Sequence, residues 1–70
     1  MGVALHTNSM KLGDLKRHLR KHDCFVLRDR GDHTVYQNKV NGKTAPVPRH
    51  AEIDNVLARI ICKQLGIDRP

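Results

Sequence analysis

The residues of this chain that could do chemistry lie in one short stretch, residues 28–36, which reads Arg-Asp-Arg-Gly-Asp-His-Thr-Val-Tyr. Histidine is the side chain whose ordinary pKa lies nearest neutrality, so it can accept a proton at physiological pH. His33 follows a glycine-containing turn and has Arg28 and Arg30 nearby in the sequence, and these cations favour an anionic substrate. The stretch therefore predicts a histidine that acts as a proton acceptor on a phosphate ester. The alternative is a strand-end histidine whose imidazole only hydrogen-bonds the turn.

The net charge of the chain also indicates an anionic partner. It has 13 Lys and Arg against 7 Asp and Glu, a formal net charge of +6 and a pI near 9.9. This balance is typical of proteins that bind nucleic acid or another polyanion, although a small protein can also be basic only for solubility. Phe25 and Tyr36 are the only aromatic residues, too few for the base-stacking platform of a cold-shock or RRM-type protein. Contacts with a nucleic acid are therefore expected mainly at its backbone.

Length and cysteine usage restrict the architecture. A chain of 70 residues forms one domain at most, and it buries only about 60% of its unfolded surface, so we expect a thin core and a site on the surface or in a shallow groove. Cys24 and Cys62 form no C-x-x-C pair, which predicts reduced thiols packed as small hydrophobes. The sequence lacks an apolar run of membrane-spanning length and a signal-peptide h-region. A soluble cytoplasmic protein is therefore expected.

The first element that can position the histidine is a helix. Residues 1–9 have no periodicity and are expected to be a loosely ordered N-terminal extension before a domain at residues 10–70. In residues 11–22 the three leucines recur at helical spacing and define an apolar face. The opposite face carries four cations, Lys16, Arg17, Arg20 and Lys21. A solvated face is the common explanation of such a run, but the concentration of charge also favours an anionic partner.

Two histidines of this predicted helix have a spacing that can chelate a metal. His18 and His22 are four residues apart, on one face of a helix. The sequence offers no acidic base between them and no evident third ligand. They are interpreted as solvated side chains, and no metal site is predicted.

The middle of the chain predicts three antiparallel strands. Residues 24–28 and 33–38 read as two strands joined by a turn at residues 29–32 in which Gly31 can adopt positive φ, and alternation puts His33 on the same face as Val35. Asn41-Gly42 is a strong type I′ turn signal, so a third strand is expected at residues 43–47. Pro46 has no N–H to donate, which predicts that this strand lies at an edge of the sheet or is irregular.

The last element is the strongest helix signal. Its apolar residues recur at 3.6-residue spacing: Ile53, Val56, Leu57, Ile60, Ile61 and Leu65. Gly66 is placed to end the helix. The expected order is helix, three strands, helix. Together these elements predict an α+β fold in which both helices cover one face of the sheet and bury every apolar stripe.

With these elements in order, residues 10–67 resemble the HicA (YcfA-like) family of toxin mRNA interferases. The segments that carry the resemblance are Leu15-Lys16-Arg17-His18-Leu19, Cys24-Phe25-Val26-Leu27-Arg28, Gly31-Asp32-His33, Pro48-Arg49-His50 and Leu57-Ala58-Arg59-Ile60-Ile61. The resemblance implies a double-stranded-RNA-binding-domain-like α-β-β-β-α fold and endonucleolytic cleavage of mRNA, a single-stranded RNA substrate, in the cytoplasm. It also implies a HicB-type antitoxin as partner.

The resemblance assigns the family's catalytic histidine to His33. The family's turn reads Gly-Ser-His, whereas Asp32 replaces the serine here, and Cys24 stands where a glycine usually precedes the aromatic residue. The expected reaction is removal of the ribose 2′-OH proton by His33 and attack of that oxygen on the adjacent phosphorus, without metal or cofactor. His50 is a candidate proton donor to the leaving oxygen. The cations expected to bind RNA or stabilise the phosphate are Arg28, Arg30, Lys43, Arg49, Lys16, Arg17 and Arg20.

Two alternatives use the same fold without catalysis. A small RNA-binding module would account for the charge and leave His33 as a bystander, and it predicts salt-dependent RNA binding that is insensitive to replacement of His33. A protein that only binds an acidic partner would account for the charge as well, but it assigns no role to the Gly-Asp-His turn.

Overall fold

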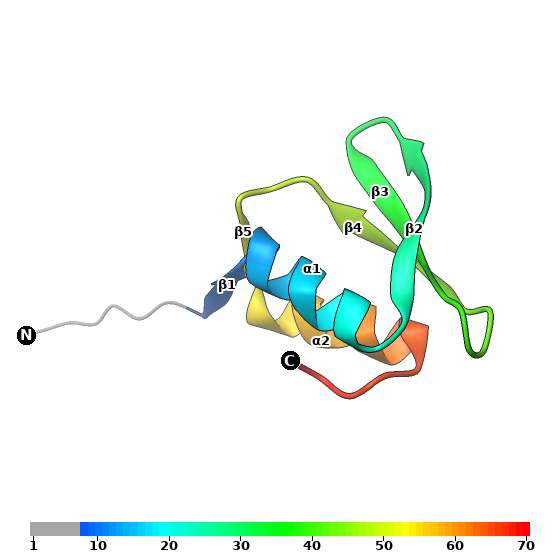
Figure 1. Ribbon diagram of the computed structural model, residues 1–70. Helices are drawn as coiled ribbons and strands as arrows, with labels where there is room; N and C mark the ends of the chain where they lie inside the picture. Colours follow the sequence, from blue (N-terminus) through cyan, green and yellow to red (C-terminus); the bar gives the residue numbers. More distant parts are fainter. Residues whose placement is uncertain (1–7) are drawn as a thin grey trace, which may run out of the picture.

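The computed structural model describes residues 8–70, and in this part of the chain it contains two helices and five strands (Figure 1). The helices are α1 (Leu12–Lys21) and α2 (Asn55–Leu65), and the strands are β1 (Ser9–Lys11), β2 (Cys24–Arg30), β3 (His33–Asn38), β4 (Thr44–Pro48) and β5 (Glu52–Asp54). Strands β2, β3 and β4 form an antiparallel sheet in that order. The predicted α+β fold with an α-β-β-β-α order is confirmed, and the predicted edge position of the strand with Pro46 is confirmed as well.

A second, two-stranded sheet was not predicted. Strand β1 pairs with β5 in antiparallel register, with Met10 opposite Ile53. The Ser9 hydroxyl donates to the Glu52 carboxylate over 2.9 Å, and the Asn55 N–H donates to the Asn8 carbonyl over 2.6 Å. Residues 8 and 9 therefore belong to the folded domain, two residues earlier than expected, while residues 1–7 of the expected extension lie outside the described residues. Three residues are too short a strand to be recognised by alternation.

The core lies between the two helices and one face of the sheet. Its buried hydrophobic residues are Leu15, Leu19, Cys24, Tyr36, Ala45, Val47, Ile53, Ala58, Ile61, Cys62 and Leu65. The predicted apolar face of α1 is confirmed, because Leu15 and Leu19 are fully buried. Both thiols are free and buried, as expected of small hydrophobes.

The apolar stripe of the last helix is only partly buried, contrary to the prediction. Ile53 lies in β5, and the helix starts at Asn55 with the Asp54 carboxylate accepting from the Val56 N–H over 2.8 Å. The buried face of α2 consists of Ala58, Ile61, Cys62 and Leu65. Val56, Leu57 and Ile60 are exposed. A domain this small has one thin core, and a helix at its surface buries a single stripe.

The two hairpin loops differ in kind. Gly31 and Asp32 alone connect β2 to β3, and Gly31 has the positive φ that was predicted, +60°. Residues 39–43 connect β3 to β4, and of the Asn41-Gly42 pair only Gly42 has positive φ. A type I′ turn needs positive φ at both residues, so that prediction is wrong. The Asn41 amide instead donates to the Leu65 carbonyl over 3.1 Å, which joins this longer loop to the end of α2.

Candidate active site on the open face of the sheet

His33 lies on the face of the sheet that points away from the helices. Tyr36 and Asn38 are buried against the helices, and side chains alternate along a strand, so His33 and Val35 project from the opposite face. His33 is the first residue of β3, and its side chain is 40% exposed. Because the helices do not cover this open face, a polymer can reach the imidazole without any opening of the core.

A β-bulge decides which residues of β2 accompany the histidine. The register pairs Val26 with Tyr36 and then Arg28 with Val35, so one extra residue interrupts the alternation of β2 between these pairs. Beyond the bulge Arg30 lies directly opposite His33. Regular alternation would instead have put an aspartate opposite the histidine and both arginines on the helix side. The bulge therefore supplies the positive charge beside the imidazole.

Arg30 and Arg28 are the cations nearest to His33 on this face. Directly opposed residues of an antiparallel pair have Cα atoms about 4.5–5.5 Å apart, and diagonal neighbours are about 7–8 Å apart. Arg30 lies directly opposite His33, and Arg28 is a diagonal neighbour of His33. Both guanidinium groups can reach an anion that contacts the imidazole. The two arginines were predicted from the sequence, and the structure brings both onto the face of the histidine.

Asp32 orients the imidazole. Its carboxylate oxygen Oδ1 lies 3.1 Å from Nδ1 of His33. This hydrogen bond is the main reason why the pKa of Asp32 lies below its ordinary value, and a smaller lowering comes from the charge of the nearby His50. A carboxylate can only accept, so the neutral form of the imidazole donates through Nδ1 and keeps the lone pair on Nε2. An Asp at this position therefore suits a histidine that acts as a base through Nε2.

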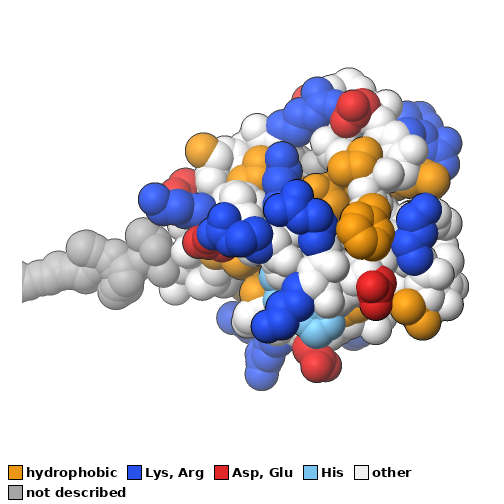
Figure 2. Space-filling view, viewed as in Figure 1, with side chains coloured by type: hydrophobic (Ala, Val, Ile, Leu, Met, Phe, Trp, Pro, Cys, Tyr) orange, Lys and Arg blue, Asp and Glu red, His pale blue; other side chains and the backbone are white. Residues whose placement is uncertain are grey.

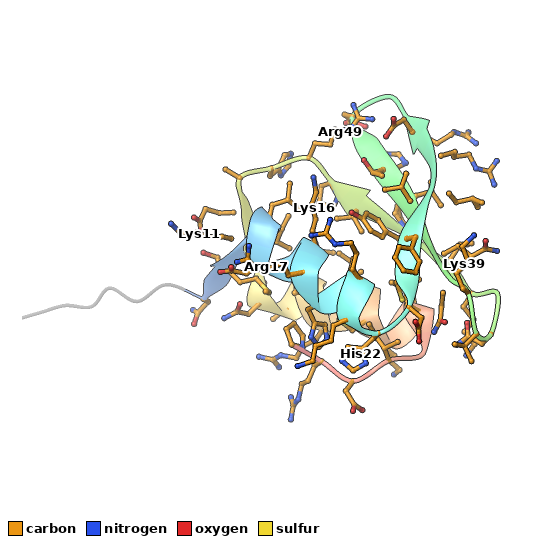
Figure 3. All side chains as sticks on the ribbon, in the orientation of Figure 1. Lys11, Lys16, Arg17, His22, Lys39 and Arg49 are labelled. Carbon is orange, nitrogen blue, oxygen red and sulfur yellow. The ribbon has the colours of Figure 1, made fainter. Side chains whose placement is uncertain are left out.

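Arg49 is held on the other face of the sheet. Its Nη2 lies 2.8 Å from the Asp29 carboxylate, and its Nε donates to the Thr34 hydroxyl over 3.2 Å. Thr34 alternates with His33, so this cluster faces the helix side, where Figure 3 shows Arg49 beside the β2–β3 hairpin. The Arg49 backbone N–H donates to the Asp32 carbonyl over 3.3 Å. Arg49 thus ties the end of β4 to the hairpin and supports the site, but its guanidinium does not join His33.

The partners of Arg49 were not predicted from the sequence. Asp29 and Thr34 are paired across the hairpin two residues from the turn, and the Thr34 hydroxyl also donates to the Asp29 carboxylate over 3.3 Å. The two-residue turn is the signal that could have found them. Once Gly31 and Asp32 are taken as the loop, the register near the turn follows.

The remaining predicted cations lie elsewhere. Lys43 is at the opposite end of β3, next to Gly66 at the end of α2. Lys16, Arg17 and Arg20 are exposed on α1, and Arg17 forms an ion pair with Asp14. Lys16 and Arg17 are labelled in Figure 3, and basic side chains gather over this helix in Figure 2. The domain therefore has two separate groups of cations, one beside His33 and one on α1.

Neither the thiols nor the helical histidines add to the site. Burial raises the pKa of the Cys62 thiol to about 11, and it raises the pKa of Cys24 as well, so both remain protonated and poorly nucleophilic at neutral pH. The centroids of the His18 and His22 rings lie 4.5 Å apart with the ring planes tilted by 53°, and His18 Nε2 contacts the Asp68 carbonyl at 2.7 Å. Within residues 8–70 no group of three possible metal ligands is present.

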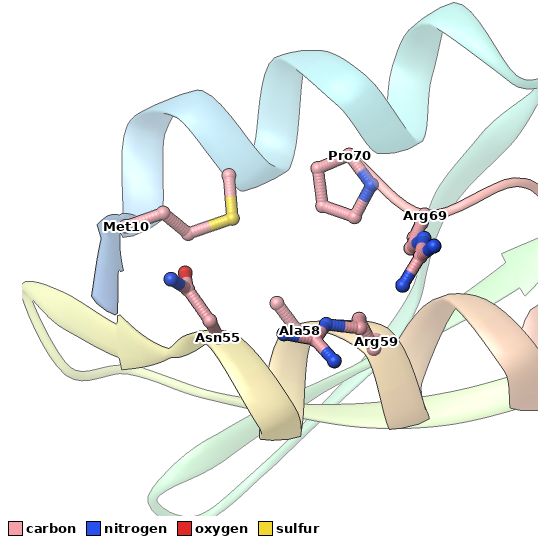
Figure 4. A pocket seen from close by; sticks show the side chains of 6 residues that line it. All are labelled: Met10, Asn55, Ala58, Arg59, Arg69 and Pro70. Carbon is pink, nitrogen blue, oxygen red and sulfur yellow. The ribbon is translucent and has the colours of Figure 1, made fainter. Parts of the chain in front are cut away.

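A cavity of about 400 Å³ lies away from the histidine. Its lining residues are Met10, Asn55, Ala58, Arg59, Arg69 and Pro70, which Figure 4 shows between the start of α1, α2 and the C-terminal segment. None of these residues is a histidine or a carboxylate, so the cavity offers no general base.

Neither α1 nor α2 is long and apolar enough to span a membrane.

Fold and site together define a small basic α+β domain that presents one oriented histidine and two arginines on an open sheet. The family model described as the HicA toxin of bacterial toxin–antitoxin systems matches residues 13–67. The chain therefore belongs to the HicA toxin family, and its role is that of a toxin in such a system. No curated protein and no solved structure matches the chain.

Proposed function

We propose that this toxin is an mRNA interferase, a metal-independent endoribonuclease that cleaves mRNA in the cytoplasm and is neutralised by a HicB-type antitoxin. Membership of the HicA toxin family supports the toxin role. The observation that carries the enzymatic part is the position of His33, exposed on the open face with Nδ1 held by Asp32 and with Arg30 directly opposite.

In the proposed reaction Nε2 of His33 removes the proton of a ribose 2′-OH. The 2′-oxygen forms a bond to the adjacent phosphorus while the bond from phosphorus to the 5′-oxygen breaks, which leaves a 2′,3′-cyclic phosphate and a 5′-OH. Arg30 and Arg28 stabilise the negative charge that grows on the phosphoryl oxygens. His50, which is close enough to Asp32 to lower the pKa of that carboxyl, would protonate the departing 5′-oxygen.

The side chains of the open face favour single-stranded RNA. Among the described residues, Phe25 is the one aromatic side chain of this face, 39% exposed and opposite Gln37. One ring can stack with one base, so affinity must come largely from phosphate contacts. In-line attack by a 2′-oxygen also needs a flexible backbone, which a single strand provides and a duplex does not.

The test compares cleavage of a long single-stranded RNA in EDTA by the wild type and by His33→Ala. A general base contributes about 10²–10⁴-fold, so we expect a loss of that size. His18→Ala is the matched control, because it removes a histidine that lies on α1. The same RNA with 2′-deoxy nucleotides should resist cleavage, and the products of normal RNA should carry cyclic phosphate. Thermal unfolding should show that all three proteins are folded.

One observation favours the non-catalytic alternative, in which the domain only binds RNA. The cations of α1 lie on the helix side and could bind a polyanion without contributing to chemistry at His33. If neither wild type nor His33→Ala cuts RNA while both bind it equally, the interferase proposal fails and the binding module replaces it.

A further inference from the structure

The two edges of the three-stranded sheet expose different backbone groups. The Asn38 N–H donates to the Lys43 carbonyl, whereas the Lys39 N–H donates to the Asp23 carbonyl. In an antiparallel ladder the direction of the backbone groups alternates with each residue. The even-numbered residues of β3 therefore bond β4 and the odd-numbered residues bond β2. This alternation fixes which residues of each edge strand direct their N–H and C=O groups away from the sheet.

The β4 edge is closed. Its residues opposite the odd-numbered residues of β3 are Thr44, Pro46 and Pro48, and these direct their backbone away from the sheet. Two of the three are prolines, which have no N–H to offer. A further strand could form few hydrogen bonds here. Proline on an edge is one of the ways in which natural sheets avoid pairing with other chains.

The β2 edge is open. By the same alternation, Val26 and Asp29 direct their backbone N–H and C=O groups outward, and no described residue bonds them on that side. The strand contains no proline. Three consecutive apolar side chains are exposed along it, Phe25 at 39%, Val26 at 53% and Leu27 at 40%. An edge with free donors, free acceptors and an apolar surface fits an added strand.

Charge selects the kind of strand that fits. Arg28 and Arg30 follow the apolar residues on β2, and Figure 2 shows hydrophobic atoms over β2 with Lys and Arg side chains on both sides. We propose that the β2 edge is a docking site for an extended segment of a partner protein in which apolar and acidic residues alternate. The apolar residues would lie beside Val26 on the helix side of β2, and the acidic residues would lie on the open face and pair with the two arginines.

A second copy of this chain and an RNA both fit this edge less well. Two molecules with a net charge of +6 repel each other. Antiparallel pairing of β2 with itself about Val26 would also put Asp29 opposite Asp23, and directly opposed like charges destabilise a sheet. RNA could pair with the arginines, but it has no peptide ladder for the Val26 and Asp29 backbone groups.

Docking at this edge would also affect the histidine site. An acidic strand beside Arg28 and Arg30 would occupy the cations that we assign to the RNA phosphate. This consequence rests on the proposed ribonuclease function, whereas the docking itself does not. Binding is therefore tested without RNA, so its failure and the failure of catalysis are distinguishable.

The test is an NMR titration of the full-length protein with a synthetic peptide of about ten residues in which valine and glutamate alternate. We expect saturable binding at up to millimolar peptide, with slower hydrogen exchange of the Val26 and Asp29 amides. Val26→Pro should abolish this binding, since it removes an outward N–H and no ladder bond. Val26→Thr is the matched control, because it keeps the N–H and the branched side chain. A peptide N-methylated at alternate residues blocks the ladder without changing the protein.

Loss of binding with either Val26→Pro or the N-methylated peptide, with retention in Val26→Thr, supports the site. The proposal is overturned if the valine–glutamate peptide does not bind at millimolar concentration, or if it binds without protecting the two amides. It is also overturned if N-methylation leaves binding unchanged. One further outcome would assign the edge to a second copy instead. In that case the wild type forms a concentration-dependent dimer, Val26→Pro abolishes the dimer, and the N-methylated peptide fails to disrupt it.

Discussion

The two ends of β3 differ in how firmly they are built into the protein. At one end the buried Asn38 amide donates to the Leu65 carbonyl over 2.8 Å, and its oxygen accepts from the Val40 N–H over 2.8 Å. At the other end His33 is partly exposed beside a two-residue turn, and its side chain contacts the fully exposed Asp32. One strand thus joins a rigid end in the core to an accessible end in solvent. The comparison predicts that substitutions at the first end lower stability, whereas those at the second end change RNA cleavage or RNA binding.

The largest effect on stability is expected from Asn38→Ala. The substitution removes a buried amide that joins β3 to the end of α2, which should cost about 2–3 kcal/mol in the free energy of unfolding. Cleavage per folded molecule should stay the same, because the site lies at the opposite end of the strand. Urea unfolding and RNA cleavage measure the two quantities. Gln37→Ala is the neighbouring control and should change stability by less than about 0.5 kcal/mol. A similar loss in both variants would contradict the comparison.

The buried thiol near the same end predicts alkaline sensitivity. The pKa of Cys62 is about 11 in the folded protein against an ordinary value of 9.0. The unfolded chain therefore loses this proton first, and stability falls as the pH rises from 9.0 towards 11, by at most about 2–3 kcal/mol. Cys62→Ala should be less stable at neutral pH but should lose less stability over that interval. Urea unfolding at both ends of the interval is the measurement, and equal slopes would show that Cys62 does not contribute.

At the exposed end, Arg30→Ala should reduce RNA cleavage by about tenfold, because it removes a cation directly opposite His33. Stability should be nearly unchanged, since the side chain is exposed. Lys39→Ala removes an exposed cation near the other end of β3 and is the control for general loss of charge. Initial rates at two salt concentrations separate the two cases. If both variants lose the same activity, Arg30 acts only through net charge.

The smallest effect is expected from Asp32→Ser. Removing a negative charge beside the phosphate site should strengthen RNA binding by about two- to fivefold at low salt. The folded state lowers the pKa of Asp32, so its contribution to stability is present at neutral pH and is lost as the pH falls below its ordinary value of 3.8 through the lowered pKa. Acid unfolding of wild type and variant should therefore converge at low pH. An unchanged RNA affinity would show that the Asp32 carboxylate does not face the phosphate.

The two edges of the three-stranded sheet also differ, because one is closed to further pairing and the other is open. Pro46 and Pro48 block β4 at the residues whose backbone points outward, whereas β2 leaves Val26 and Asp29 free. The sequence showed both strands, one with prolines and one apolar, but it predicted an edge position only for the strand with Pro46. Which residues point outward, however, depends on hydrogen bonds to β3 and could not be obtained from either strand alone.

The sequence by itself determined the local elements of this protein. Leucine spacing defined α1, Gly31 and Gly66 marked a hairpin turn and a helix end, and alternation put His33 and Val35 on one face. These features depend on neighbours within a few residues, so they can be obtained from the order of residue types. The resemblance to the HicA family was also carried by short segments in order.

Tertiary structure decided the rest. The bulge after Val26 exists only when β2 pairs with β3, and it exchanges an aspartate for Arg30 opposite His33. Other features depend on contacts between residues that are distant in the sequence. They are the packing of one face of the sheet against the helices, the pairing of β1 with β5 and the ion pair between Arg49 and Asp29. Alternation fixes side chains only relative to each other within one strand. Their final direction is set by packing between elements, which no local pattern contains.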